Sequence, residues 1–127
     1  MAIRGVGVDI VHIPRIEAAL RRWGDRFRRK VFTENEILAA RNRPREGKFL
    51  AMRFAAKEAF AKATGMGMRS PLKWHAIEVK SDDLGRPEIT VSEDLRKWCE
   101  TKNIRHWHLS LSDDNDHAIA VVILEGD

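Results

Sequence analysis

Two carboxylates and one ammonium group, those of Asp9, Glu58 and Lys62, are the side chains whose surroundings suggest chemistry. Asp9 closes the stretch GVGVD, in which Gly5 and Gly7 keep bulk away from one face of the chain. A carboxylate held in this way suits a hard cation such as Mg²⁺, which usually takes one or two such ligands from a protein. A core strand that merely ends in an aspartate has the same pattern, and alone the pattern favours that simpler interpretation.

The stretch RFAAKEAFAKATG, residues 53–65, carries the other two groups. Glu58 and Lys62 are four residues apart, so on a helix they lie one above the other. Such a pair is most often a surface ion pair worth roughly a few tenths of a kcal/mol. Because the helix is rich in alanine and phenylalanine, we expect Glu58 to be partly buried, and a buried carboxylate needs a partner or a metal. Spacing alone leaves both interpretations open.

Composition narrows the class of protein. With 127 residues, of which 43% are hydrophobic and 33% charged, the chain suits one globular domain spanning 1–127. Its single cysteine, Cys99, excludes an internal disulfide framework and a cysteine-based zinc cluster. No window is long and apolar enough to cross a membrane, and the first residues lack the features of a signal peptide. We therefore expect a cytoplasmic protein without a membrane partner.

Positive charge gathers near the N-terminus. The net charge is +4, and residues 21–30, RRWGDRFRRK, hold six basic side chains against one acidic one. A surface of this kind attracts anions, whether nucleic acid, phosphorylated small molecules or an acidic protein. A small basic nucleic-acid-binding domain is therefore one alternative. Against it, the sequence has no aromatic RNA-binding motif, zinc finger or recognition-helix unit.

The expected elements place the charged groups on one strand and one helix. Pro14 suits a first helical turn, Gly24 interrupts that helix, Thr33 and Glu36 form a capping box, and Gly65 stops the longest helix. Strands are expected at 3–11, 72–80, 88–91, 105–112 and 118–124, and helices at 14–23, 33–41, 49–64 and 92–102. The order β-α-α-α-β-β-α-β-β predicts an α+β fold with a mostly antiparallel sheet packed against helices.

Taken together, GVGVDIV and the later RFAAKEAFAKATGMG resemble the paired signature of the 4′-phosphopantetheinyl transferases. FAAKEAFAKA followed by two spaced glycines is similar to the small, holo-acyl-carrier-protein synthase branch of that family. The likeness extends through FTENE, GRP and HLSLSDDNDHAIA, and so covers nearly the whole chain. It implies the fold of that family. It also implies transfer of phosphopantetheine from coenzyme A to a serine of an apo acyl carrier protein, with release of adenosine 3′,5′-bisphosphate, in support of fatty acid biosynthesis.

The resemblance also implies roles for individual residues. Asp9 and Glu58 would bind Mg²⁺, and Lys62 would contact a phosphate, which makes these three the expected catalytic residues. The expected coenzyme A contacts are Lys62, Arg53, Gly65, Arg86, Pro87 and His108. Some of them would come from a neighbouring subunit of a homotrimer, with active sites at the interfaces. An acidic acyl carrier protein, rather than nucleic acid, would meet the basic residues Arg15, Arg22 and Arg26.

Several points stay open at the level of sequence. Lys57 either touches ligand or supports Glu58. The base that deprotonates the carrier serine is Glu58, a metal-bound water or another acid. His106 and His108 share a strand face, but no third zinc ligand is nearby, so we favour a solvent-facing strand. Asp113 stands where many relatives have a second histidine, so no role of that histidine transfers to this chain.

Overall fold

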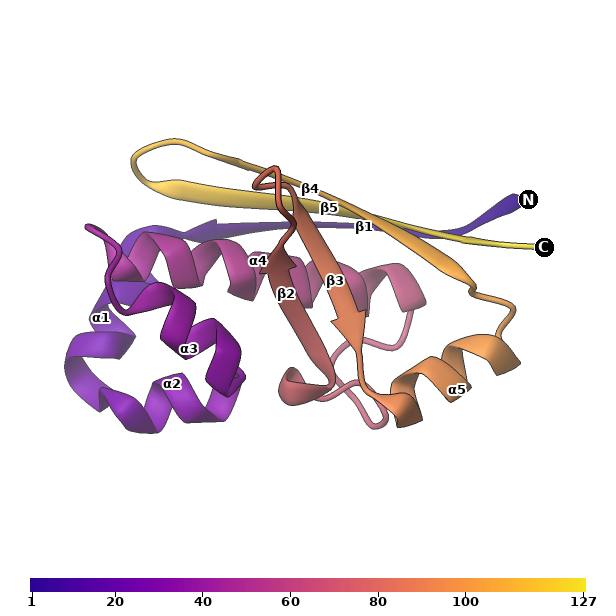
Figure 1. Cartoon of the computed structure of the whole chain (residues 1–127), viewed down its shortest axis with the longest axis horizontal. Helices are drawn as coiled ribbons and strands as arrows, with labels where there is room; N and C mark the ends of the chain where they lie inside the picture. The colour runs from indigo at the N-terminus through magenta and orange to yellow at the C-terminus, as the bar shows by residue number, and fades with distance from the viewer.

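Two separate antiparallel sheets and five α-helices make up the computed structural model, which describes all of residues 1–127 (Figure 1). The first sheet has the strand order β1-β5-β4, and the second is the β2–β3 hairpin. Along the chain the elements are β1 (Ala2–His12), α1 (Ile13–Trp23), α2 (Asp25–Val31), α3 (Glu34–Ala40), α4 (Glu46–Thr64), the 3₁₀ helix η1 (Trp74–Ala76), β2 (Ile77–Ser81), β3 (Pro87–Val91), α5 (Glu93–Thr101), β4 (His106–Asp113) and β5 (His117–Gly126).

The expected α+β architecture and element order are confirmed, with three local differences. Gly24 adopts a φ of 54° and separates α1 from a further helix, α2, which was not expected. Helix α4 begins at Glu46, three residues before the expected start. The strand expected from residue 72 begins only at Ile77, because the preceding residues form η1. No helix combines the length and apolar character needed to span a bilayer.

Helix α4 is the centre of the molecule. It lies along β1 and β5 in Figure 1, and the inward face of β5 packs against it through Ala118, Ala120, Val122 and Leu124. The helix also contacts α1, α3 and β2. It is therefore buried on several sides, which is what a helix without a polar face requires. Its fully buried residues include Leu50, Ala51, Ala55, Ala56, Lys57, Ala59 and Phe60.

The two glycines of β1 allow the helix backbone to lie directly against the strand backbone. A methyl group added at Gly5 would overlap the carbonyl oxygen of Ala63, and one at Gly7 would overlap that of Ala59. The space left by these glycines is therefore filled by α4. The expectation that the glycines keep bulk away from this face of β1 is wrong, because they admit the helix backbone instead. This close approach brings the last turns of α4 beside Asp9.

The other face of the three-stranded sheet is bare and apolar. Val6, Val8 and Ile10 alternate along β1 and are 56–63% exposed. Their partners across β5 are Ile123, Val121 and Ile119, which are only partly covered. Because strand residues alternate between faces, the face that packs on α4 and this outer face are fully distinct. No helix of the chain covers the outer face.

Candidate active site

Asp9 and Lys62 meet at the seam between β1 and α4. The Lys62 ammonium donates to the Asp9 carboxylate at 2.8 Å and to the Val8 carbonyl oxygen at 3.2 Å. The side chain of Asp9 is only 12% exposed, whereas that of Lys62 is 52% exposed. Strand β1 therefore holds the carboxylate in a fixed place, and the lysine reaches it from the solvent side. The hydrogen bond to Asp9 raises the pKa of Lys62.

Glu58 lies one helical turn before Lys62 and is half-buried, as the sequence predicted. Its pKa is raised, first by burial and then by the negative charge of Asp9, while Lys62 acts in the opposite direction. Lys62 pairs with Asp9 and not with Glu58, so the half-buried Glu58 carboxylate has no ion-pair partner of its own. A carboxylate in such a place is suited to a cation as its partner.

A groove of about 270 Å³ runs beside these carboxylates, between α1 and α4. Its polar lining consists of Asp9, Glu58 and Arg15. Its apolar lining consists of Ile10, Val11, Ile16, Ala19, Phe27 and Phe54. The structure therefore places Arg15 beside the two carboxylates. The aromatic lining residues, Phe27 and Phe54, were not predicted as site residues, although Phe54 lies four residues before Glu58 and therefore on the same side of α4.

Lys57 points away from this groove, which settles the open question about it. Its ammonium group donates to the carbonyl oxygens of Trp74 and Ile77, at 2.9 and 2.6 Å. It also forms an ion pair of 2.7 Å with Glu36, and both side chains are fully buried. Burial lowers the pKa of Lys57 despite the opposing effect of Glu36. Lys57 therefore belongs to the interior and contacts no ligand in the groove.

Arg53 is also buried, and it has no carboxylate partner. It is 7% exposed, its guanidinium lies 3.9 Å from the centre of the Phe49 ring, and one nitrogen donates to Ser81 at 3.4 Å. Its Nε is the one buried side-chain polar atom of the protein without a hydrogen-bond partner. It lines neither the groove nor the cavity described below. A coenzyme A contact at Arg53 stays a prediction.

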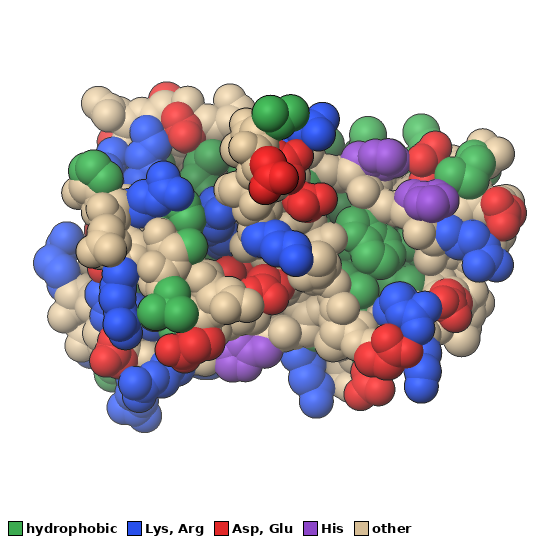
Figure 2. All heavy atoms as spheres, viewed as in Figure 1, with side chains coloured by type: hydrophobic (Ala, Val, Ile, Leu, Met, Phe, Trp, Pro, Cys, Tyr) green, Lys and Arg blue, Asp and Glu red, His purple; other side chains and the backbone are tan.

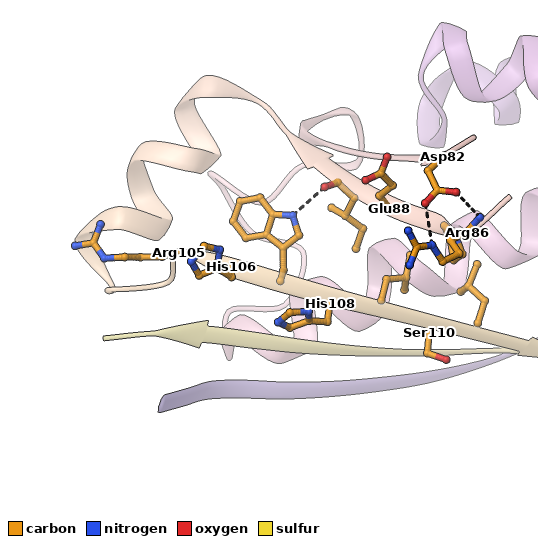
Figure 3. A pocket seen from close by; sticks show the side chains of 12 residues that line it. Asp82, Arg86, Glu88, Arg105, His106, His108 and Ser110 are labelled. Carbon is orange, nitrogen blue, oxygen red and sulfur yellow. Dashed lines mark hydrogen bonds and ion pairs between the residues drawn. The ribbon is translucent and has the colours of Figure 1, made fainter. Parts of the chain in front are cut away.

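A second, larger cavity of about 770 Å³ lies between the β2–β3 hairpin and the free edge of β4 (Figure 3). Arg86, Pro87 and His108 all line it. Arg86 donates to Asp82 at 2.9 Å, and His108 lies 2.8 Å from a Glu125 carboxylate oxygen. The structure therefore groups these three expected coenzyme A residues with one another, but not with Asp9 and Glu58.

Gly65, another expected coenzyme A contact, lines neither the groove nor the cavity. It ends α4 in the left-handed conformation, with a φ of 81°, and is exposed. Asp113, where many relatives have a histidine, forms an ion pair of 3.4 Å with Lys48 near the start of α4. This position is thus used to attach the β4 end to the helix.

The basic residues Arg22 and Arg26 flank an exposed tryptophan. Their guanidinium groups lie 4.9 and 5.8 Å from the centre of the Trp23 ring, and Trp23 is 48% exposed. Lysine and arginine side chains are dense at the α1–α3 end in Figure 2. Trp23 was not selected from the sequence as a site residue, although a tryptophan within RRWGDRFRRK is itself unusual. The surface formed by Arg22, Trp23 and Arg26 thus combines positive charge with an exposed aromatic ring.

Comparisons with known proteins agree on one family. A family model described as the 4′-phosphopantetheinyl transferase superfamily matches residues 5–122. The chain is 42% identical to the holo-[acyl-carrier-protein] synthase of Vibrio parahaemolyticus and 42% identical to that of Escherichia coli K12, each over 98% of this chain and 99% of the relative.

Solved structures give the same result. The crystal structure of the Neisseria meningitidis holo-[acyl-carrier-protein] synthase has a TM-score of 0.93 and 39% identity, covering 98% of this chain and 99% of the other. The Bacillus anthracis synthase in complex with CoA (3′,5′-ADP) has a TM-score of 0.82 and 37% identity, and the match covers 98% of each chain.

Proposed function

The chain belongs to the 4′-phosphopantetheinyl transferase superfamily, and we propose that it is a holo-acyl-carrier-protein synthase. It transfers the 4′-phosphopantetheine group of coenzyme A to a serine of apo acyl carrier protein and releases adenosine 3′,5′-bisphosphate. We place this reaction in the cytoplasm, in the supply of carriers for fatty acid biosynthesis. The observation that carries the proposal is the meeting of Asp9, Glu58 and Lys62 beside an open groove.

We propose further that Asp9 and Glu58 hold Mg²⁺. The donor set fits, because Asp9 and Glu58 line the same groove and carboxylate oxygens are the ligands that Mg²⁺ takes from proteins. The chain offers no cluster of three or more His, Cys, Asp or Glu side chains for a metal. Magnesium commonly accepts one or two protein carboxylates and completes its shell with phosphate and water oxygens. When bound, it would neutralise charge on the pyrophosphate as the P–O bond opens.

The protein's own groups supply orientation and charge. Lys62 is half exposed, so its ammonium, which pairs with Asp9 in this structure, would be free to contact a phosphate oxygen of coenzyme A if Asp9 held Mg²⁺. Fixed positive charge beside a departing phosphate lowers the barrier because it stabilises the transition state more than the ground state. Arg15, in the same groove as Glu58, lies where it can meet the incoming carrier protein.

The basic surface of α1 and α2 provides the carrier-binding side of this proposal. Arg15, Arg22 and Arg26 are all exposed, and Trp23 adds an apolar anchor between the last two. An acidic carrier approaching this surface would be steered electrostatically, which mainly raises the association rate. The same positive charge suggested nucleic acid from the sequence, but the groove with two carboxylates beside it is unfavourable for a phosphate backbone unless a cation intervenes.

Mass spectrometry of an apo carrier protein tests the proposed reaction. Incubation with the enzyme, coenzyme A and Mg²⁺ is expected to increase the carrier mass by one phosphopantetheine and to release adenosine 3′,5′-bisphosphate. Chelation of the metal with EDTA is expected to stop the increase, and added Mg²⁺ to restore it. A carrier whose acceptor serine is replaced by alanine is the control. An unchanged carrier mass under all conditions would overturn the proposal.

We propose a homotrimer whose subunits meet through the outer face of the three-stranded sheet. Val6, Val8 and Ile10 are all more than half exposed and lie on one face of β1, and contiguous exposed apolar side chains of this kind often mark an interaction site. His108 faces the same side, since it alternates with the inward Trp107 along β4. A neighbouring subunit on this face would bring the cavity containing His108 close to another chain, as the resemblance to the small branch implies.

Val8→Glu is expected to convert the trimer to monomers, because a carboxylate on this face cannot be buried against a second subunit without a partner. Light scattering with size-exclusion chromatography measures the change, and phosphopantetheine transfer is expected to fall with it. Leu38→Glu is the matched control, since Leu38 is 50% exposed but lies on α3, away from this face. A Val8→Glu variant with the mass and activity of the wild type would contradict the proposed interface.

A further inference from the structure

We propose that the buried Glu36–Lys57 ion pair is a positioning device for the transfer site, which fixes the rotation of α4 so that Glu58 and Lys62 face Asp9. The inference rests on the proposed function, because transfer is the activity on which it acts. It assigns to Lys57 and Glu36 a role that involves no contact with substrate. Both residues are positioning residues, and Asp9, Glu58 and Lys62 do the chemistry.

The ammonium group of Lys57 has all its donors in use. It donates to the carbonyl oxygens of Trp74 and Ile77 and to the carboxylate of Glu36. These partners lie on η1, β2 and α3, so one side chain of α4 is attached to three other elements. An ammonium group with three fixed partners can neither turn nor shift without losing one of them.

Glu36 is equally constrained. One carboxylate oxygen accepts from the backbone N–H of Thr33 at 2.9 Å, within the capping box of α3, and also from Lys57. The other oxygen accepts from the N–H of Val79 on β2 at 2.8 Å. The acid is thus held at both oxygens by backbone groups, and it presents a rigid partner to the lysine.

Stability alone does not explain this pair. Two charges with no solvent exposure bear a large desolvation cost, and well-packed apolar residues in their place are often as stable or more so. The best-attested benefit of a buried ionic pair is that it selects one register of packing over its neighbours. On α4, selecting one register means selecting the direction of every side chain on the helix.

Helix geometry connects that register to the site. Lys57 and Glu58 are consecutive, so their side chains leave the helix about 100° apart. When Lys57 is held toward η1 and β2, Glu58 is directed to the α1 side and Lys62 toward β1. On the opposite flank, the backbone of β1 lies tightly against α4 at Gly5 and Gly7. The helix is therefore held from two sides, with the carboxylate and the ammonium between the two contacts.

The same network reaches the wall of the groove. The carbonyl of Trp74 accepts from Lys57, and the Trp74 ring stacks on Phe54 with a centroid distance of 5.0 Å. Phe54 lines the groove together with Glu58 and Asp9. Loss of the lysine would therefore release η1 as well as α4, and would disturb the groove from two directions.

Lys57→Met and Glu36→Gln test this role, because they remove charge while keeping most of the side-chain volume. Calorimetric titration of Mg²⁺ into each protein with coenzyme A present measures the metal site without relying on turnover. We expect Mg²⁺ affinity and kcat each to fall by about 10- to 100-fold, the usual effect of removing groups that orient metal ligands. The KM for the carrier protein is expected to change less than kcat, since Arg22 and Arg26 of the proposed carrier surface surround Trp23 and do not contact this pair.

Glu46→Gln is the matched control. Glu46 forms a bidentate pair with Arg28 at the other end of the same helix, at 2.8 Å through both oxygens. Its loss is expected to lower the unfolding midpoint while Mg²⁺ affinity and kcat stay at wild-type values. The comparison thus shows whether any loss of an ion pair on α4 affects the site, or only the loss of the pair next to Glu58.

The outcomes are distinguishable. If Lys57→Met lowers the unfolding midpoint but keeps wild-type Mg²⁺ affinity and kcat in the folded protein, the pair is only structural and the inference is overturned. If Lys57→Met does not fold, Glu36→Asp is used instead, because it keeps both charges but draws the carboxylate back from Lys57. Mg²⁺ affinity and kcat are then expected to fall by a smaller factor. Absence of an effect with Glu36→Asp would then count against the inference. A wild-type protein that transfers nothing would instead overturn the proposed function.

Discussion

Glu58→Gln is expected to lower phosphopantetheine transfer roughly 10²- to 10³-fold while raising the midpoint of thermal unfolding at neutral pH. The loss of activity follows from removing one of the two carboxylates proposed to hold the cation. The gain in stability follows from the pKa of Glu58, which burial and the charge of Asp9 raise in the folded protein. A site that performs chemistry commonly has such a stability cost.

The sign of the stability effect depends on pH. Because the folded-state pKa of Glu58 lies above the unfolded value, the folded protein binds the proton more tightly. Ionised Glu58 therefore costs stability at pH values above its folded-state pKa, and this cost disappears as the pH falls below the ordinary glutamate pKa. The unfolding midpoints of the variant and the wild type are expected to differ most at neutral pH and to converge in acid.

Calorimetry across a pH series, together with the mass-spectrometric transfer assay, checks this prediction. Asp83→Asn is the control, since Asp83 is an exposed acid in the hairpin turn and its replacement removes the same charge away from the site. Retention of the wild-type transfer rate by Glu58→Gln would contradict the catalytic assignment. An unfolding midpoint of Glu58→Gln below that of the wild type at neutral pH would contradict the conclusion that ionised Glu58 costs stability.

Gly7→Ala is expected to lower the free energy of unfolding by about 3 kcal/mol or more, and to give little soluble protein. The added methyl group would overlap the carbonyl oxygen of Ala59, a backbone atom that cannot rotate away. Relief would require α4 to move off β1, which would separate Asp9 from Glu58 and Lys62. Any folded fraction is therefore expected to bind Mg²⁺ poorly.

Urea unfolding of Gly7→Ala and Gly65→Ala measures two different costs of a glycine replacement. The first is steric overlap with a neighbouring backbone, and the second is strain in the left-handed backbone conformation. Gly65 has a φ of 81° but no atom within 4 Å of an added Cβ, so its replacement involves only left-handed strain of about 1–2 kcal/mol. The Gly7 variant is expected to be the less stable of the two. Equal stability of the Gly7 variant and the wild type would mean that α4 and β1 are not packed backbone to backbone.

The ends of helices were predicted correctly where the sequence has a residue that caps or stops a helix. The capping box at Thr33 and Glu36 is present as expected, and so is the C-terminal stop of α4 at Gly65. The region of η1 was expected as a strand, because its alternating residues do not reveal that the chain turns at Trp74 to meet Lys57. Helix α2 was not expected because it is short and highly charged, so it has little apolar periodicity.

The site was predictable only in part. Asp9, Glu58 and Lys62 were selected by paired motifs, and the structure brings Asp9 and Lys62 together at 2.8 Å. The network around Lys57 was not predictable, because Glu36 lies on another helix and nothing in the order of residues indicates that the two are neighbours. Glycine in β1 suggested open space, and only the packing of α4 shows what occupies it.

The pairing of β1 with β5 has a consequence for synthesis on the ribosome. Strand β1 emerges early, yet its only partner in the sheet runs from His117 to Gly126, so the nascent chain must carry β1 unpaired while most of the protein is made. Contacts over such long sequence separations slow folding. The sheet around Asp9 is therefore complete only after translation has passed β5, although Asp9 and its partner Lys62 on α4 are both made long before.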